Sequence, residues 1–195
     1  MAITRDNSYF LLNFFWALGL ANRNTLLDEG PMMQNGEEGV GRFASTGGWT
    51  LGTKPATEFY SSAPIISLTA EQQARLEEVA QGVYRPCCGN PTSFPDCNHG
   101  MAMLGLLELM ASQDATEDEM FEAAKYVNAH WFPQQMLEVA TYFETAEGVS
   151  FADLDGRMAS GPDYFSGRGF GDVHQWLADN GLLEQLPGQG GSCGV

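Results

Sequence analysis

The sequence predicts an all-α protein: a single globular domain of six or seven helices with one long irregular loop. Apolar residues recur at helical spacing or fill whole segments, two segments begin with helix-capping signals, and the alternating pattern of strands is almost absent. At 195 residues the chain is long enough for one substantial core that needs no disulfides in order to fold. We therefore expect residues 1–195 to form one helical domain.

The first predicted helix covers residues 9–22 and is capped by Asp6, Asn7 or Ser8. Its residues are apolar on nearly every side, which is typical of a helix that is buried or packed against another subunit. A homo-oligomer is therefore one expectation for this chain.

Residues 28–66 are rich in glycine and have no helical period. A connection of this length is usually functional or disordered. Its aromatic residues predict an ordered loop wrapped over the helical body, with a short strand pair; these residues are Phe43, Trp49, Phe59 and Tyr60. Segment 36–60 is the predicted contact surface for a protein partner.

The next helix begins at a capping box, in which the side chains of Thr69 and Gln72 each satisfy a free backbone N–H of the first turn. One apolar stripe follows at helical spacing, and Pro86 lies beyond its end. The stripe consists of Leu76, Val79, Ala80 and Val83.

Residues 100–113 are apolar on all sides and predict the central buried helix. Glu108 is the one charged residue in this segment. We expect it to reach an edge or to form an ion pair, and the alternative is a carboxyl group with a raised pKa.

Three further helices follow. Thr116 and Glu119 form a second capping box, and Pro133 suits the first turn of the next helix. The last helix should end at Gly181, since glycine tolerates the left-handed conformation found after helix ends. Residues 186–195 predict a flexible tail by their composition.

The formal charge is −16, from 25 acidic and 9 basic residues. This balance argues against binding to nucleic acid, which requires clustered Lys and Arg, and against anionic membrane surfaces. No apolar run reaches the roughly 20 residues of a transmembrane span, and the start lacks the signature of a signal peptide. We expect a soluble protein that acts outside the cytoplasm, periplasmic or secreted.

Function is indicated mainly by the cysteines. Cys87, Cys88 and Cys97 lie close together in the sequence with His99, and Cys193 lies in the glycine-rich tail. Thiolates bind soft or borderline metals, and a helix N-terminus at Cys97 favours anionic ligands. Neighbouring glycines leave backbone N–H groups free to approach sulfur.

The pattern predicts a metal-binding redox or electron-transfer protein whose four cysteines hold an iron–sulfur cluster, with His99 as the substitute ligand. The spacing matches neither paired C-x2-C zinc sites nor the common ferredoxin runs. Zinc, copper and no metal at all therefore stay open as alternatives. Copper(I) would also draw on Met101 and Met103, although core packing is the expected role of both methionines.

The competing interpretation is an extracytoplasmic interaction domain that contains no metal and is stabilised by two disulfides. Four cysteines permit this pairing in an oxidising compartment. No catalytic residue is assigned, and whether the protein is an enzyme stays open. His130 and His174 are expected at surface or half-buried positions.

Overall fold

The computed structural model describes residues 2–34 and 36–183, and the predicted tail at 186–195 lies outside them. The described part is mostly helical and contains no strand, so the all-α class is confirmed. The longer helices are α1 (Ser8–Ala21), α4 (Ala70–Gly82), α5 (Asn98–Ser112), α6 (Glu117–Trp131), α7 (Pro133–Tyr142) and α10 (Gly167–Asp179). The short helices are α2 (Thr25–Asp28), α3 (Glu37–Val40), α8 (Gly156–Ser160) and α9 (Pro162–Phe165), and further turns are η1 (Pro31–Met33), η2 (Ala56–Glu58) and the π-helical η3 (Phe143–Glu147).

The described residues thus form ten α-helices, and the prediction of six or seven is wrong. The additional helices have only four or five residues, too few to show a helical period in the sequence. Local hydrogen bonds hold them: the side chain of Asn24 caps α2, and that of Asp155 accepts from two N–H groups of α8.

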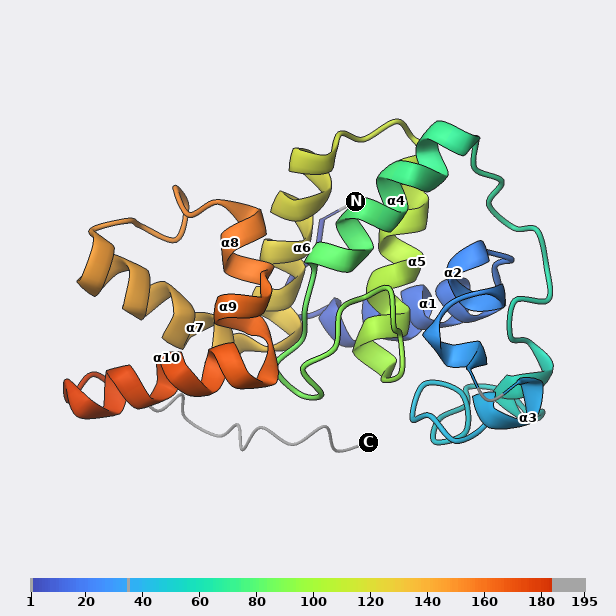
Figure 1. Cartoon of the computed structure of the whole chain (residues 1–195), viewed down its shortest axis with the longest axis horizontal. Coiled ribbons are helices and arrows are strands. Elements are labelled where there is room, and N and C mark those ends of the chain that lie inside the picture. The colour runs from blue at the N-terminus through green and yellow to red at the C-terminus, as the bar shows by residue number, and fades with distance from the viewer. Residues whose placement is uncertain (1, 35, 184–195) are drawn as a thin grey trace.

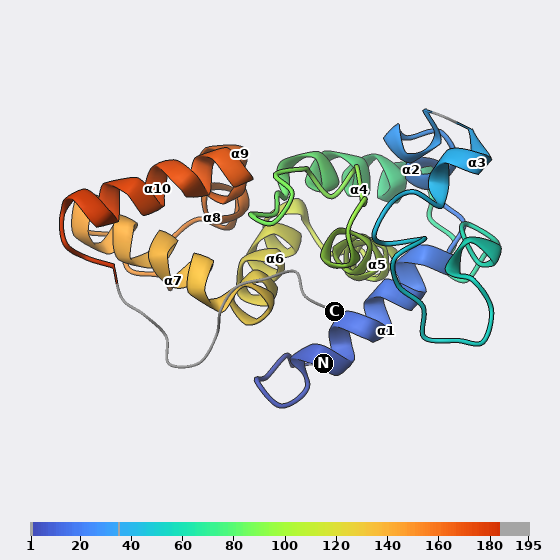
Figure 2. The ribbon, with the colours of Figure 1, turned by 90° about the horizontal axis from the view of Figure 1, so that it is seen from below.

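Two hydrophobic clusters form the interior. The first draws mainly on α1, α4, α5 and α6, and the second on α7 to α10 together with Phe132. In Figure 1, helices α7 to α10 group at one end of the molecule and α2 and α3 lie at the other. Figure 2 shows the same division from below, with α6 between the two groups.

The predicted central helix is confirmed as α5, most of whose residues are buried. It crosses α1 at Gly19 and Gly105, where the two backbones nearly touch. A Cβ atom on Gly105 would lie 2.3 Å from the carbonyl oxygen of Phe15, so only glycine permits this approach.

Both capping boxes form as predicted, at Thr69–Gln72 and at Thr116–Glu119. Pro133 begins α7. Gly181 adopts a positive φ of 68° just after Asn180, the C-cap residue of α10, which confirms its predicted place at the end of this helix.

The loop of residues 28–66 packs on the first cluster through its aromatic side chains. The ring of Trp49 lies on that of Trp16, with centroids 5.3 Å apart, and Phe43 meets Phe94 edge to face. The predicted strand pair is wrong: among the described residues the loop has only one isolated bridge, which joins its Ala63 to Asn22 at the end of α1. Short helical turns take its place.

Among the described residues, the fully buried charged side chains include Lys125, Glu108 and Arg85, and the last of these belongs to the cysteine loop. Lys125 donates to the carbonyl oxygens of Phe151 and Leu154 and forms an ion pair with Glu122 at 2.8 Å. Glu108 has no such partner among the described residues, so the expected edge position or ion pair is wrong. Burial instead raises its pKa well above the ordinary value, as the alternative interpretation proposed.

Candidate metal centre

The cysteine loop is a short excursion between α4 and α5 that its own backbone closes. Tyr84 and Pro91 form an antiparallel bridge, and the N–H of Thr92 donates to the carbonyl oxygen of Val83. Gly89 turns the chain with a φ of 73°, which L-residues rarely adopt. The tip of this loop carries Cys87 and Cys88 and returns toward the start of α5.

Cys97 is the N-cap residue of α5, so the helix start fixes the third sulfur beside the loop. The Sγ atom of Cys97 lies 3.8 Å from that of Cys87 and 3.8 Å from that of Cys88. The Sγ atoms of Cys87 and Cys88 are 3.9 Å apart. The three sulfurs therefore form a nearly equilateral triangle.

All three cysteines are free, and their separations are almost twice the disulfide bond length of about 2.05 Å. Cys87 and Cys88 are exposed, whereas Cys97 is half-buried. The cluster is therefore open to solvent on the side of the loop tip.

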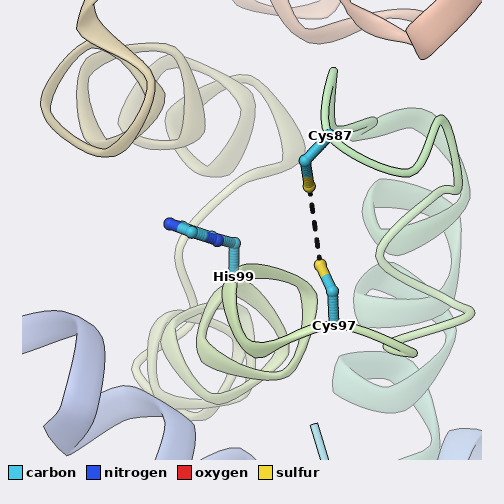
Figure 3. Close-up of side chains that lie close together, drawn as sticks. All are labelled: Cys87, Cys97 and His99. Atoms are coloured by element: carbon cyan, nitrogen blue, oxygen red, sulfur yellow. Dashed lines mark hydrogen bonds between the residues drawn. The ribbon is translucent and has the colours of Figure 1, made fainter. Parts of the chain in front are cut away.

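His99 lies in the first turn of α5, beside the Cys87–Cys97 pair (Figure 3). One nitrogen of its ring lies within 4.8 Å of both sulfurs. Its ring packs on that of Phe132 with centroids 4.4 Å apart. Burial, followed by the nearby positive charge of Arg85, lowers the pKa of His99 to about 4, which leaves a neutral imidazole at pH 7.

A polar frame surrounds the sulfurs. Arg85, whose side chain is only 1% exposed, forms an ion pair with Asp96 at 2.7 Å and donates to the carbonyl oxygen of Phe94. Asn90 donates to the other oxygen of Asp96 at 2.9 Å. The Sγ atom of Cys88 donates to the same Asp96 at 3.5 Å. Both ends of the loop are thus tied to one carboxylate.

Hydrogen bonds between the thiols make Cys87 and Cys97 differ in pKa. Hydrogen bonds with Cys87 and Cys88 lower the pKa of Cys97 well below its ordinary value, and the charge of Arg85 acts in the same direction. Hydrogen bonding to the other two thiols raises the pKa of Cys87. Cys97 is therefore the first of the two to become a thiolate.

The site lies where the two hydrophobic clusters meet. Phe132, beneath His99, belongs to the second cluster, while α5 belongs to the first. The N–H of Tyr84 donates to the carbonyl oxygen of Ser160 at 2.8 Å. The cysteine loop thus contacts α8 directly.

The predicted ligands Cys87, Cys88, Cys97 and His99 come together in two overlapping groups that could each hold a metal ion. Cys87, Cys97 and His99 form one group, and Cys88, Asp96 and Cys97 form the other. The proposed fourth cysteine, Cys193, lies outside the described residues. Met101 and Met103 are fully buried in the first cluster, which confirms their expected packing role.

Sequence reasoning missed Arg85 and Asp96 as parts of the site. Both residues lie between Tyr84 and Cys97, and a charged pair within a cysteine loop was the available signal. The other two histidines lie elsewhere, as expected: His130 is half-buried, and the half-exposed His174 pairs with Glu138 at 2.7 Å.

Comparisons with protein-family models, with curated proteins and with solved structures give no match for this chain. Among the described residues, no helix has both the length and the apolar composition needed to cross a membrane. The geometry of the cysteine cluster is therefore the main indication of function.

Proposed function

We propose that this protein binds a single metal ion at a tetrahedral centre formed by Cys87, Cys88, Cys97 and His99. The triangle of sulfurs carries the proposal. Thiolates about 2.3 Å from a zinc ion, at tetrahedral angles, lie about 3.8 Å apart. The three sulfur separations are 3.8, 3.8 and 3.9 Å.

The same spacing favours one ion over a cluster. In a [4Fe–4S] centre each cysteine binds a different iron, so the cluster itself lies between the sulfurs. Sulfurs in mutual contact leave no room for it. The iron–sulfur cluster and the electron-transfer role predicted from the sequence therefore rank second.

The donor set favours Zn²⁺. Three thiolates and one imidazole are a frequent ligand set of structural zinc sites, and Zn²⁺ prefers four tetrahedral ligands. Copper(I) also binds thiolates, but Met101 and Met103 are fully buried in the core and do not extend the ligand set.

A bound ion would also stabilise the fold. It would tie the tip of the cysteine loop to the N-terminus of α5, next to the contact between the two hydrophobic clusters. Because the ligands come together only in the folded chain, binding free energy becomes folding free energy. The proposed role is a structural metal centre at this junction.

The test is anaerobic purification, followed by metal analysis, a visible spectrum and a free-thiol count. One zinc per chain and no colour support the proposal. Iron, acid-labile sulfide and broad absorbance near about 400 nm would establish the cluster instead. No metal, no free thiols and a mass four hydrogens below that of the reduced chain would show two disulfides and overturn both metal hypotheses.

Two matched variants identify the fourth ligand. His99→Ala should lose the zinc or bind it weakly, whereas Cys193→Ser should retain it. The reverse pattern would show that the fourth ligand is Cys193. His174→Ala, which changes a half-exposed histidine that pairs with Glu138, is the control and should bind zinc like the wild-type protein.

We also propose that the protein acts outside the cytoplasm and that residues 36–60 form the contact surface for a protein partner. Fractionation of the native host tests the location, and recovery from the cytosol alone would overturn it. Trp49 packs on Trp16, so its replacement should lower the thermal midpoint as well as any partner binding.

A further inference from the structure

Arg85 is a buried cation with unused hydrogen-bond donors. Its Nη2 atom donates to the carbonyl oxygen of Phe94 at 2.9 Å and to Asp96 at 2.7 Å. Its Nε and Nη1 atoms are buried and have no partner among the described residues. Buried N–H groups without acceptors are rare in folded proteins, so these two atoms indicate a missing partner.

The unused donors lie against the first turn of α5. A Cβ atom on Gly100 would lie 2.7 Å from Nη1 and 2.9 Å from Nε of Arg85. The nearest atom, Cζ, would lie at 2.5 Å, so the face of the guanidinium lies against this turn. Gly100 follows the N-cap residue Cys97 by three positions, so the guanidinium lies at the start of the helix that carries the third sulfur. Asp96 Oδ1 accepts from both the Sγ atom of Cys88 and Nη2 of Arg85, so one carboxylate oxygen links the arginine to a cysteine of the cluster.

Charge provides a second reason for an arginine at this place. A divalent ion with three thiolates and a neutral imidazole carries a net charge of −1. The Asp96 carboxylate lies next to this set. Arg85 forms an ion pair with Asp96 at 2.7 Å, so its positive charge lies beside these negative groups.

We propose that Arg85 is the positioning residue of the metal centre. In the metal-loaded protein its Nε–H and Nη1–H groups donate to thiolate sulfurs. Its positive charge offsets the negative charge of the ligand set. This inference rests on the proposed function. A guanidinium is suited to this role because its donors have a fixed planar arrangement and its charge is less strongly hydrated than that of lysine. Outer-shell hydrogen bonds of this kind orient ligands and tune metal affinity.

The first test measures zinc affinity by competition with a chelator under anaerobic conditions at pH 7. Arg85→Lys keeps the charge but loses the fork of donors, and Gly100→Ala displaces the guanidinium by filling its place. Each variant should weaken zinc binding by about 10–100-fold, the usual effect of removing an outer-shell partner. Arg157→Lys, which changes a partly exposed arginine paired with Glu117, is the control and should leave the affinity unchanged.

The second test uses the wild-type protein, so it does not depend on the folding of a variant. With ¹¹³Cd²⁺ in the site, an N–H···S hydrogen bond transmits a scalar coupling between the metal and the donor proton. The Nε–H or Nη1–H signals of Arg85 should show this coupling. A merely structural arginine, held by Asp96 and Phe94 alone, would show none.

The outcomes separate the two proposals. If the wild-type protein binds neither Zn²⁺ nor Cd²⁺, both proposals fall. If the wild-type protein binds zinc, Arg85→Lys binds it within about threefold of wild type, and no coupling appears, the metal centre stands and the role of Arg85 is overturned.

Discussion

Replacing Gly105 with alanine tests whether the crossing of α1 and α5 sets the fold. The new Cβ atom would lie 2.3 Å from the carbonyl oxygen of Phe15 and 2.7 Å from the backbone nitrogen of Gly19. Both neighbours belong to the backbone of α1, so no side-chain rotation relieves the clash. The two helices must separate by about 1 Å, and the side chains between them lose packing.

The expected magnitude follows from two opposing effects. Overpacking a core costs about 1–3 kcal/mol, and a clash with backbone belongs at the upper end of this range. Alanine gains about 1 kcal/mol over glycine in a helix interior. The net loss is about 2 kcal/mol, which lowers the thermal midpoint of a chain of this size by about 4–8 °C.

Gly171→Ala is the matched control, because Gly171 is exposed in α10 and a Cβ atom there would meet nothing within 4 Å. Only the gain in helix propensity applies, so this variant should be more stable by up to about 1 kcal/mol. Both variants are measured by thermal and urea unfolding, followed by far-ultraviolet circular dichroism at one fixed metal content. Equal stability changes at the two positions would refute the close crossing of α1 and α5.

Three further predictions concern the centre, a buried acid and a helix cap. Zinc at 1,000 times its dissociation constant should stabilise the protein by about 4 kcal/mol, measured as a fall in thermal midpoint after chelation, and an unchanged midpoint would argue against a structural centre. The pKa of Glu108 is raised in the folded protein. Above the unfolded pKa of about 4.3, the unfolded chain loses this proton while the folded protein keeps it. The free energy of unfolding therefore decreases as the pH rises above that value. Glu108→Gln should remove this part of the decline between pH 5 and pH 8 in urea titrations, and an identical pH slope in both proteins would contradict it. Thr116→Ala should lower the unfolding free energy by about 1 kcal/mol through loss of the capping box, whereas a change below about 0.3 kcal/mol would show that the cap contributes little.

Local signals in the sequence are enough to predict the longer helices. Capping boxes depend on residues three apart, and both form in the structure. The apolar character of residues 100–113 predicts burial without knowledge of any partner, and α5 is indeed the central helix. The helices of one turn could not be predicted in this way, since four or five residues are too few to show a helical period of apolar residues.

The environment of Glu108 could not be predicted from the sequence. The sequence shows one carboxylate in an apolar helix, but whether a cation lies opposite depends on which elements pack around α5. Among the described residues none provides an ion pair, and the acid is fully buried. The raised pKa is therefore a consequence of tertiary packing.

For the candidate centre, the sequence by itself determines the ligand types and their grouping, because Cys87, Cys88, Cys97 and His99 lie within one short stretch. Only the tertiary structure decides the distances between the sulfurs, since these depend on how the loop closes and where α5 begins. The separations of 3.8–3.9 Å are the reason for proposing a single ion in place of the iron–sulfur cluster predicted from the sequence. The structure also places the buried guanidinium of Arg85 beside the thiols, because ion pairing with Asp96 holds the two ends of the loop together.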